Sequence, residues 1–554
     1  MLHAEGPLLT VDVGAREVTE TPIDEELATF VGGRGVATKL AHERIPFDAP
    51  PLGPENRLYL ATGPLQMSQM SFTGRMSLTG LSPLTDGLLS TNAGGYLSRN
   101  FADTGYSAVE FVGESDDLLA IHIRDDGVEF ESVPELEQAL VPEVTEYMDE
   151  NHGLESENLV TIGPAGENRV RFASVMTYDS RAFGRGGLGA VFGAKNIKTV
   201  SFRGDSRPAI DVPDVQQEVH QAAATADDMM RERGTTSYTE FINDQFSLPT
   251  RYFKEHSFDG ADGIGGEAVA EKKYRKGACS VCAFACKLPT RDEETGLETE
   301  GPEFETVFAF GSNVMVDDMV AVMKSNELCD TLGLDTISAG DAVAAYLDSE
   351  DEFGNVDLIH ELTEKIAYRD GVGDLLAEGV ERFHDELGVE NWTVKGLEFA
   401  AHDGRVLHGQ GLSYAVANRG ADHMYARMQG PEYRGEIDPE TLEGKPEVLI
   451  TRENVGGFRD SAIVCAFSDG YIDENQYEEL FQADYSDLLD VGSRVVELER
   501  HFNNKRGMDR SDDQLPYDLP GLEDAIAEYY RLRGWNDDGT VPDDAVGSYS
   551  PADD

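Results

Sequence analysis

Three closely spaced cysteines, Cys279, Cys282 and Cys286, are the strongest chemical signal in the sequence. Thiolates spaced in this way can converge on one side of a turn that continues into a helix, as a cubane iron–sulfur cluster requires. A structural zinc site would need a second ligand pair, and no further CxxC or HxxxH pattern follows. The spacing therefore predicts a [4Fe–4S] cluster rather than zinc or buried thiols. Cys465 or Cys329 could complete it.

A second signal is a run of glycines with two arginines, Arg181 and Arg185, within residues 179–190. Glycines let backbone N–H groups approach an anion, and guanidinium groups bind phosphate oxygens. Gly184–Gly189 also has the form GxGxxG, but a dinucleotide fold needs a long helix there and an acid about 20 residues later. We interpret the run as a phosphate-binding loop. An ordinary turn and a dinucleotide site are the alternatives.

The third signal is an acidic motif, Asp330-Thr-Leu-Gly333-Leu334-Asp335. Its simplest interpretation is a helix end capped by Gly333 in the left-handed conformation. Asp330 would then lie in the last turn, where the helix dipole disfavours an anion. This placement is better explained if Asp330 accepts hydrogen bonds from a bound donor, such as the amino-pyrimidinone edge of a pterin.

The composition restricts the class of protein that carries these motifs. The 554 residues include 45 Lys+Arg and 105 Asp+Glu, which gives a net charge of −60. Such a charge argues against nucleic-acid binding, which needs a basic face. The 13 Lys against 32 Arg favour a surface adapted to molar salt over a local acidic docking surface. Five cysteines, no signal peptide and no apolar run of membrane-spanning length predict a cytoplasmic protein without a membrane segment.

The elements that position the motifs change type along the chain, which predicts an α+β protein. Residues 1–205 are Gly-rich with short apolar alternations and are predicted to form a β-rich domain. Residues 206–410 and 411–554 are predicted to form two mainly helical domains. The predicted helices are Val316–Leu332, Ile337–Leu347, Val356–Tyr368, Gly373–Leu387, Tyr485–Phe502 and Gly521–Leu532. The acidic end, residues 536–554, is predicted to be a frayed tail.

Taken together, the motifs resemble those of the tungsten-containing aldehyde ferredoxin oxidoreductase family over nearly the whole chain. Besides the signals above, the similar segments are Val31–Gly35, Ala61–Leu65, Thr91–Gly95, Glu303–Glu305 and Gly420–His423. The resemblance implies a β-rich base domain and two helical domains, with the cofactor at their interface. It implies tungsten bound by two pterins (tungstopterin) beside one [4Fe–4S] cluster. The acidic composition suggests a haloarchaeal-type member.

The resemblance also implies roles for individual residues. Asn92 and Ala182 match positions that bind a Mg²⁺ bridging the pterin phosphates. Phosphate and pterin contacts are implied for Arg75, Gly94, Arg181, Gly184 and Arg185, and for the motif residues Asp330, Leu334 and Asp335. Asp460 and Cys465 match a second pterin motif whose Cys is the fourth cluster ligand, although Ile463-Val464 replaces the family's Gly-Leu. Cys329 matches no ligand.

The implied activity is the oxidation of an aldehyde with water to a carboxylic acid, two protons and two electrons. Glu305 and His423 match residues beside the tungsten; Glu305 is the candidate general base and His423 a candidate hydrogen-bond donor. Electrons would pass through the cluster to ferredoxin or a similar carrier, and the resemblance suggests a homodimer. Two alternatives remain open at this point: an NAD-dependent dehydrogenase that uses Gly184–Gly189, and a non-catalytic iron–sulfur electron-transfer subunit.

Overall fold

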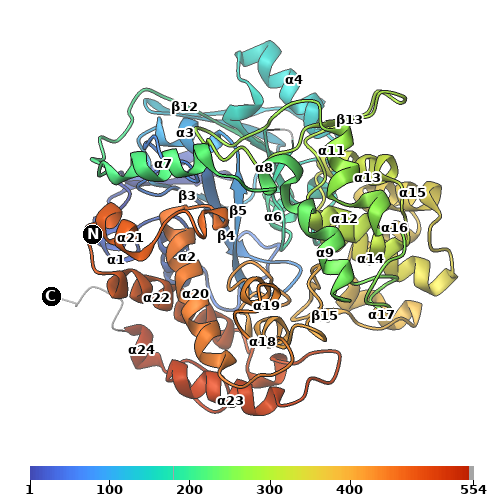
Figure 1. Cartoon of the computed structure of the whole chain (residues 1–554). Coiled ribbons are helices and arrows are strands. Elements are labelled where there is room, and N and C mark those ends of the chain that lie inside the picture. Colours follow the sequence, from blue (N-terminus) through green and yellow to red (C-terminus); the bar gives the residue numbers. More distant parts are fainter. Residues whose placement is uncertain (179, 548–554) are drawn as a thin grey trace.

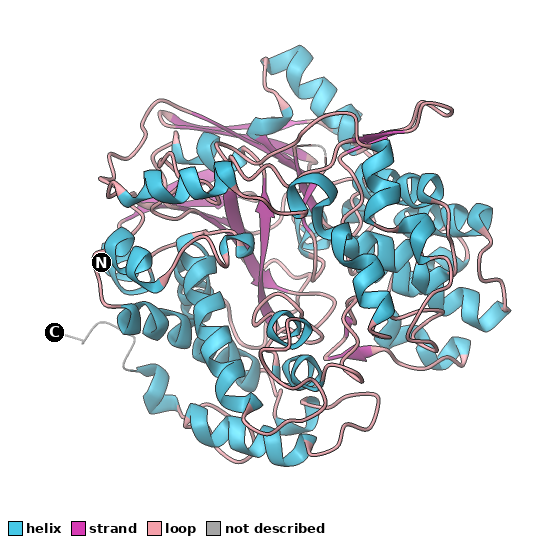
Figure 2. Ribbon diagram, in the orientation of Figure 1, coloured by secondary structure: helices cyan, strands magenta, loops and turns pink. Residues whose placement is uncertain are grey.

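The computed structural model describes residues 1–178 and 180–547. All the longer strands lie in roughly the first 200 residues, and the rest is mainly helical (Figures 1 and 2). The predicted α+β class, with a β-rich N-terminal region followed by helical regions, is confirmed.

Two six-stranded mixed sheets form the N-terminal region. The first has the order β2-β1-β6-β3-β4-β5 and consists of β1 (Leu8–Asp12), β2 (Glu17–Thr21), β3 (Leu58–Ala61), β4 (Arg75–Leu81), β5 (Leu88–Gly94) and β6 (Ala108–Val112). The second has the order β11-β10-β9-β12-β7-β8 and consists of β7 (Leu119–Arg124), β8 (Gly127–Ser132), β9 (Leu159–Thr161), β10 (Val175–Thr177), β11 (Arg181–Phe183) and β12 (Ile197–Arg203). Each contains one parallel pair, β1–β6 and β7–β12.

Successive side chains of a strand point to opposite faces of the sheet, and this explains how both faces of the first sheet are covered. Leu58 and Leu60 of β3 belong to the same core cluster as Val200 of β12, so this face packs against the second sheet. Tyr59 and Ala61 belong to a different cluster, shared with helices of the N- and C-terminal parts. Strand β3 is therefore buried on both faces, by the second sheet on one side and by helices on the other.

Helices cover these sheets and form the rest of the chain. Those of the N-terminal region are α1 (Asp24–Phe30), α2 (Gly33–Arg44), α3 (Leu97–Ala102), α4 (Val141–His152), α5 (Pro164–Glu167) and α6 (Leu188–Ala194). The middle part contains α7 (Val215–Thr225), α8 (Met230–Arg233), α9 (Thr239–Asp244), α10 (Ala261–Ile264), α11 (Gly266–Lys272), α12 (Phe304–Phe310), α13 (Met319–Leu332), α14 (Thr336–Glu350), α15 (Val356–Tyr368), α16 (Val372–Leu376) and α17 (Val380–Leu387). The last part contains α18 (His408–Val416), α19 (Gln429–Tyr433), α20 (Lys445–Ala462), α21 (Glu474–Phe481), α22 (Tyr485–Lys505), α23 (Leu522–Arg533) and α24 (Asp543–Gly547). Short hairpins β13–β14 (Thr290–Arg291, Glu298–Thr299) and β15–β16 (Thr393–Val394, Leu397–Glu398) link helices.

The prediction of one helix over Gly373–Leu387 is wrong, because the segment forms α16 and α17. Gly379 interrupts it with φ +87°, a conformation that a helix cannot contain. A Cβ at Gly379 would lie 2.6 Å from a Leu84 methyl carbon. The break thus permits close packing on the N-terminal region.

The prediction of a frayed tail over residues 536–554 is also wrong for its first part. Val541 and Val546 are buried in the core that contains α22 and α23. His501 and Lys505 both pair with Asp543, at 3.0 and 2.7 Å. These contacts fasten α24 to α22. Residues 548–554 lie outside the described residues.

Helices α12 and α13 lie in the largest core cluster, where Val307, Phe308 and Val322 are fully buried. Among the described residues, no single helix is long and apolar enough to cross a membrane. One bent pair, Phe304–Val314 with Met319–Leu332, passes that test together by length and composition alone, with a bend of 117°.

Candidate functional site

The cysteine triplet lies in an irregular loop and not, as predicted, in a turn that continues into a helix. Val281 and Ala285 both have left-handed backbones (φ 51° and 49°), which prevents a helix from forming. The loop lies against the end of β5, where the Ser280 N–H donates to the Gly95 carbonyl (2.9 Å). At Gly94, a Cβ would come within 2.9 Å of the Cys279 sulfur. A glycine is therefore required for this approach.

The fourth nearby thiol is Cys465, which follows α20 in the sequence. Its N–H donates to the Phe72 carbonyl (2.7 Å), and Cys282, Cys286 and Cys465 all pack against one core cluster. The pKa of Cys286 is raised to about 12, mainly by burial; Lys287 lowers it, and Cys279 and Cys465 raise it. Such thiols become thiolates only with a bound cation. Cys329 is buried elsewhere, beside Asp330 and Asp335.

Arg75 lies between this thiol group and the end of β5. Its Nη1 is 3.9 Å from the Cys465 sulfur, and its Nη2 donates to the Asn92 carbonyl (3.0 Å). Burial lowers the pKa of the guanidinium, but Cys465, Cys279, Asp460 and Glu303 together raise it more, so the net shift is upward. Arg75 therefore offsets part of the negative charge that the thiolates would carry.

The glycine run does not form a dinucleotide-binding unit. β10 and β11 pair antiparallel, and α6, which follows the run, has only seven residues. The alternative of an NAD site at Gly184–Gly189 is therefore wrong, since that fold needs a parallel strand–helix–strand unit. A Cβ at Gly187 or Gly189 would collide with backbone carbonyl oxygens, at 1.8 and 2.4 Å, so both glycines serve close packing. Gly184 has no such close neighbour.

The two arginines of this segment connect two parts of the site. Arg181 pairs with Glu300 and lies 3.6 Å from Glu303. Burial lowers the pKa of its guanidinium, but Glu300, Cys279, Glu303 and Asp330 raise it, and the net shift is upward. Arg185 donates to the Ala421 carbonyl at 3.2 Å and lies 3.5 Å from Asp335. Ala182, between them, pairs with Met176 in the β10–β11 ladder.

The acidic motif has the predicted helix-end geometry. Gly333 caps α13 in the left-handed conformation (φ 78°), and the Leu334 N–H donates to the Cys329 carbonyl. Asp330 is in the last turn of α13, where burial raises its pKa well above the usual range; Arg181 lowers it and Glu300 raises it. Asp335 is the N-cap of α14 and accepts from the Ile337 and Ser338 N–H groups. Asp335 thus has a structural role that the sequence interpretation missed.

The segment Asp460–Cys465, for which a second pterin motif was predicted, lies at the end of α20. Ile463 caps this helix with a left-handed backbone (φ 58°), the conformation that a glycine would adopt most easily. Asp460 lies one turn earlier, and its carbonyl oxygen would be 2.4 Å from a Cβ at Gly33. The backbone of this motif therefore keeps a glycine-like conformation despite the Ile463 side chain.

Glu305 and His423 come together with a residue that sequence reasoning missed, His402. Glu305 Oε1 lies 3.2 Å from His423 Nε2 and 3.5 Å from His402 Nε2, and Oε2 accepts from the Ala401 N–H at 2.9 Å. Burial lowers the pKa of both imidazoles. Glu305 raises that of His423, Arg185 lowers it, and His423 lowers that of His402 further. Neutral histidines therefore face the carboxylate.

A polar His402-Asp403 pair directly after the apolar residues Phe399–Ala401 is the one sequence signal that could have indicated His402. A hydrogen-bond network holds its ring, because Nδ1 lies 3.4 Å from the Tyr433 hydroxyl, which in turn accepts from Ser247. The orientation of His402 thus depends on residues from three separate segments.

Arg34, from the segment Val31–Gly35, links α2 to the segment Asp460–Cys465. It makes two hydrogen bonds to Glu499 (2.8 and 2.7 Å) and one to Asp460 (3.2 Å), and both Arg34 and Glu499 have side chains only 1% exposed. Its guanidinium also lies 3.4 Å from the centre of the Tyr425 ring. This is the charge pair that the structure buries most completely near the motif.

We expect Arg34→Met to lower the free energy of unfolding by about 3–5 kcal/mol, because it leaves the Glu499 carboxylate buried without its partner. Urea denaturation at constant high salt measures the loss. The double variant Arg34→Met/Glu499→Met is the control, since it removes both charges and should recover much of the stability. An equal or larger loss in the double variant would show that packing, and not the unpaired charge, determines the effect.

Comparison with known proteins agrees with this arrangement. Residues 8–204 match the family model "Aldehyde ferredoxin oxidoreductase, N-terminal domain", and residues 212–548 match "Aldehyde ferredoxin oxidoreductase, domains 2 & 3". The chain is 33% identical to the tungsten-containing aldehyde ferredoxin oxidoreductases of Thermococcus kodakarensis and Pyrococcus furiosus, with 97% of each chain covered. It is 25% identical to an aliphatic sulfonate oxidoreductase, WOR-like subunit, from Pyrococcus furiosus, with 99% of this chain and 96% of that protein covered.

The fold is also that of a solved structure, the active site complex BamBC of benzoyl coenzyme A reductase. The TM-score is 0.85 at 21% identity, and the comparison covers 99% of this chain and 97% of the other. The two family models together span the described sheets, the cysteine loop and the Glu305 cluster. The chain belongs to the aldehyde ferredoxin oxidoreductase family.

Proposed function

We propose that this protein oxidises an aldehyde to a carboxylic acid at a tungsten bis-pterin centre and passes the electrons through a [4Fe–4S] cluster to ferredoxin or a similar carrier. The observation that supports this most is the short segment from Arg181 to Arg185. At one end Arg181 interacts with Cys279 and Asp330, and at the other Arg185 interacts with His423. One segment therefore connects a candidate cluster site, a candidate pterin site and a candidate acid–base site.

The residues present suit these cofactors. Four thiols lie close together beside Arg75, since Cys279 and Cys465 influence the pKa values of Cys282, Cys286 and Arg75, and a cluster with four Cys ligands requires such a grouping. Within the described residues, Glu305 Oε1, His423 Nδ1 and Arg185 Nε are buried without an aligned hydrogen-bond partner. Buried polar atoms are normally paired, so such atoms in one region favour a site for a polar ligand.

In this proposal Cys279, Cys282, Cys286 and Cys465 hold the cluster. Asp330 and Asp460 bind the two pterins, together with the contacts implied for Arg75, Gly94, Arg181, Gly184, Arg185, Leu334 and Asp335. Asn92 and Ala182 would provide oxygens for a Mg²⁺ ion, which would offset the charge of the pterin phosphates. The tungsten centre would supply a two-electron oxidation, and the cluster would release the electrons one at a time.

The chain itself contributes proton transfer and orientation. The overall change is aldehyde + water → carboxylic acid + two protons + two electrons. As the oxygen of water bonds to the aldehyde carbon, Glu305 Oε1 accepts the proton that water loses. The Ala401 N–H fixes the other carboxylate oxygen at 2.9 Å, so Oε1 keeps one direction. His423 and His402, both neutral, lie 3.2 and 3.5 Å from Oε1 and do not neutralise its charge.

An aldehyde is the favoured substrate because the matches to the tungsten-containing aldehyde ferredoxin oxidoreductases are closer than the match to the sulfonate oxidoreductase subunit, at 33% against 25% identity. The Glu305–His423–His402 cluster also favours an enzyme over a non-catalytic electron-transfer subunit, which would need no acid–base group.

The composition of the anaerobically purified protein tests the proposal. We expect one tungsten, two pterins and four irons per chain, together with aldehyde-dependent reduction of a one-electron dye. The metals and pterin are measured by elemental analysis and by oxidative release of the pterin. A protein with zinc but no iron or tungsten would contradict the proposal. A loaded protein that reduces the dye with a sulfonate but not with any aldehyde would change the substrate class only.

A further inference from the structure

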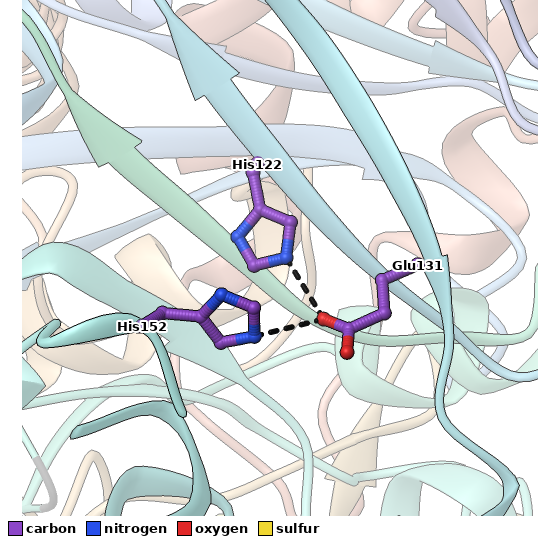
Figure 3. Close-up of side chains that lie close together, drawn as sticks. All are labelled: His122, Glu131 and His152. Atoms are coloured by element: carbon purple, nitrogen blue, oxygen red, sulfur yellow. Dashed lines mark hydrogen bonds and ion pairs between the residues drawn. The ribbon is translucent and has the colours of Figure 1, made fainter. Parts of the chain in front are cut away.

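A second cluster of metal-ligating side chains lies on the outer face of the second sheet. His122 is on β7, Glu131 is on β8, and His152 is the last residue of α4 (Figure 3). Helix α4 covers this face, because Val144 and Met148 pack with Ala120, two residues before His122 on β7. The cluster thus lies where the end of a helix meets a β-hairpin.

The three ligand atoms converge on one position. His122 Nε2 and His152 Nε2 lie 3.1 and 3.0 Å from the same oxygen, Glu131 Oε2, and one ligand atom from each residue lies within 4.8 Å of the others. Two ligands bound at 2.0–2.1 Å to a tetrahedral zinc ion are about 3.3 Å apart. Small side-chain movements would therefore place all three at bonding distance from one ion.

Neighbouring groups hold two of the ligands in suitable orientations. His122 Nδ1 lies 3.0 Å from Ser201 Oγ on β12, which also accepts from Arg124 at 3.2 Å. The other ring nitrogen of His122 is therefore directed at Glu131. The second oxygen of Glu131 accepts from the Tyr147 hydroxyl at 3.0 Å. Metal-binding histidines and carboxylates typically have such outer partners.

A simple hydrogen-bonded group does not explain His152. Its Nε2 contacts Glu131 Oε2 at 3.0 Å, yet the atom is buried and has no aligned hydrogen-bond partner among the described residues. A nitrogen that lies near a carboxylate oxygen without an aligned hydrogen bond fits two ligands of one cation. Figure 3 shows the rings of His122 and His152 side by side, each with a nitrogen directed at the carboxylate.

We propose that His122, Glu131 and His152 bind Zn²⁺, with a fourth position open to a water molecule. Two imidazoles and one carboxylate suit zinc, whereas Mg²⁺ and Ca²⁺ prefer oxygen ligands only. The side chains of His152 and Glu131 are both 27% exposed, so an ion can enter from solvent. His122 is nearly buried, so the ion would sit at the edge of the sheet. Because an ion of this kind binds only the folded protein, it would fasten the end of α4 to the sheet and stabilise the fold.

The experiment is a titration of the intact holoenzyme with Zn²⁺ after chelator treatment. It is carried out at constant high salt with excess Mg²⁺, which occupies the acidic surface. We expect one saturable equivalent of Zn²⁺ by equilibrium dialysis and a higher Tm with Zn²⁺ than without. His152→Gln and Glu131→Gln should each lose the saturable equivalent and the Tm shift. Ser201→Ala keeps all three ligands and should weaken Zn²⁺ binding by about 10–100-fold.

The matched control is Glu150→Gln, which removes an exposed carboxylate from the same helix, two residues before His152. It should bind Zn²⁺ as the wild type does. Circular dichroism and the iron and tungsten contents check that each variant is folded and loaded. A saturable equivalent that survives in folded His152→Gln and Glu131→Gln would place the zinc elsewhere and overturn the proposal, and so would the absence of any saturable equivalent in the wild type.

Discussion

Replacing Glu305 by Gln is expected to lower turnover by roughly 10²–10⁴-fold while tungsten and iron contents stay unchanged. Gln keeps the shape of the side chain. Its oxygen can still accept from the Ala401 N–H, and its amide can donate to a neutral histidine where the carboxylate now faces His423. Only the capacity to accept a proton is lost. Steady-state kinetics with an aldehyde and a one-electron dye measure the loss, which should appear in kcat rather than in KM.

Two comparisons decide what such a loss means. His402→Gln should lower turnover less, because His402 only lies 3.5 Å from Glu305 and accepts no proton in the proposed reaction. Glu327→Gln removes a half-exposed carboxylate that pairs with Lys324 on α13, and it should leave kcat unchanged. Turnover near the wild-type value in Glu305→Gln would move the base to another residue. Loss of tungsten from the variant would make Glu305 a structural residue.

The regular elements could be predicted where a local pattern agrees with the tertiary packing. Val356–Tyr368 is a helix with the predicted bounds because one apolar stripe, which includes Ile359 and Ile366, meets the core. The break at Gly379 could not be predicted in the same way. The break is caused by a contact with Leu84, nearly 300 residues earlier in the chain. The spacing of apolar residues along the segment gives no sign of a contact with so distant a residue. The packed segment before residue 548 was missed for a similar reason, since its partners are His501 and Lys505 on another helix.

The candidate site likewise has parts that the sequence could predict and parts that depend on distant contacts. Residue types and spacing indicated Cys279, Cys282 and Cys286 and the motif Asp330–Asp335 as candidates, because clusters and pterins need particular donor atoms. Asp460 and Cys465 were indicated only by the family resemblance. The backbone of the cysteine loop was not predictable, because left-handed residues such as Val281 and Ala285 have no sequence signal when they are not glycine. His402 was missed because Tyr433 and Glu305 determine its position, and both are distant in sequence.

The replacement of the family's Gly-Leu by Ile463-Val464 shows a different limit of predicting backbone conformation from sequence. A departure from a motif suggests a changed backbone, yet Ile463 has φ 58° and ψ 43°, the left-handed conformation itself. That conformation costs roughly 1–2 kcal/mol for a residue with a Cβ. Ile463 is completely buried, and burial of an isoleucine side chain contributes about 1.5–3 kcal/mol, enough to offset the strain. The helix end can therefore keep its shape and lead directly to Cys465.

Replacing Cys465 by Ser is expected to alter or abolish the iron–sulfur cluster while tungsten and pterin remain largely bound. Cys465 is the one thiol of the four that comes from the C-terminal part, and it lies five positions after Asp460, which Arg34 holds at 3.2 Å. Arg34 and the backbone bond to Phe72 do not involve the Cys465 sulfur, so the pterin side of the segment should persist. Electron transfer to an external carrier should collapse, because the segment would no longer join both redox centres. Iron content, the EPR signal of the reduced cluster and carrier reduction are the measurements.

Cys329→Ser provides the matched control, since it makes the same atomic change in a thiol that the structure places apart from the other four. Cys329 is buried beside Asp330 and Asp335 and packs in the core of the helical part. The variant should keep the EPR signal and the rate of carrier reduction, with at most a loss of stability from a buried hydroxyl. If the signal is instead lost in Cys329→Ser and kept in Cys465→Ser, the fourth ligand is Cys329. Asp460 and Cys465 would then not form a pterin and cluster motif, and the convergence of four thiols beside Arg75 would have only a structural role.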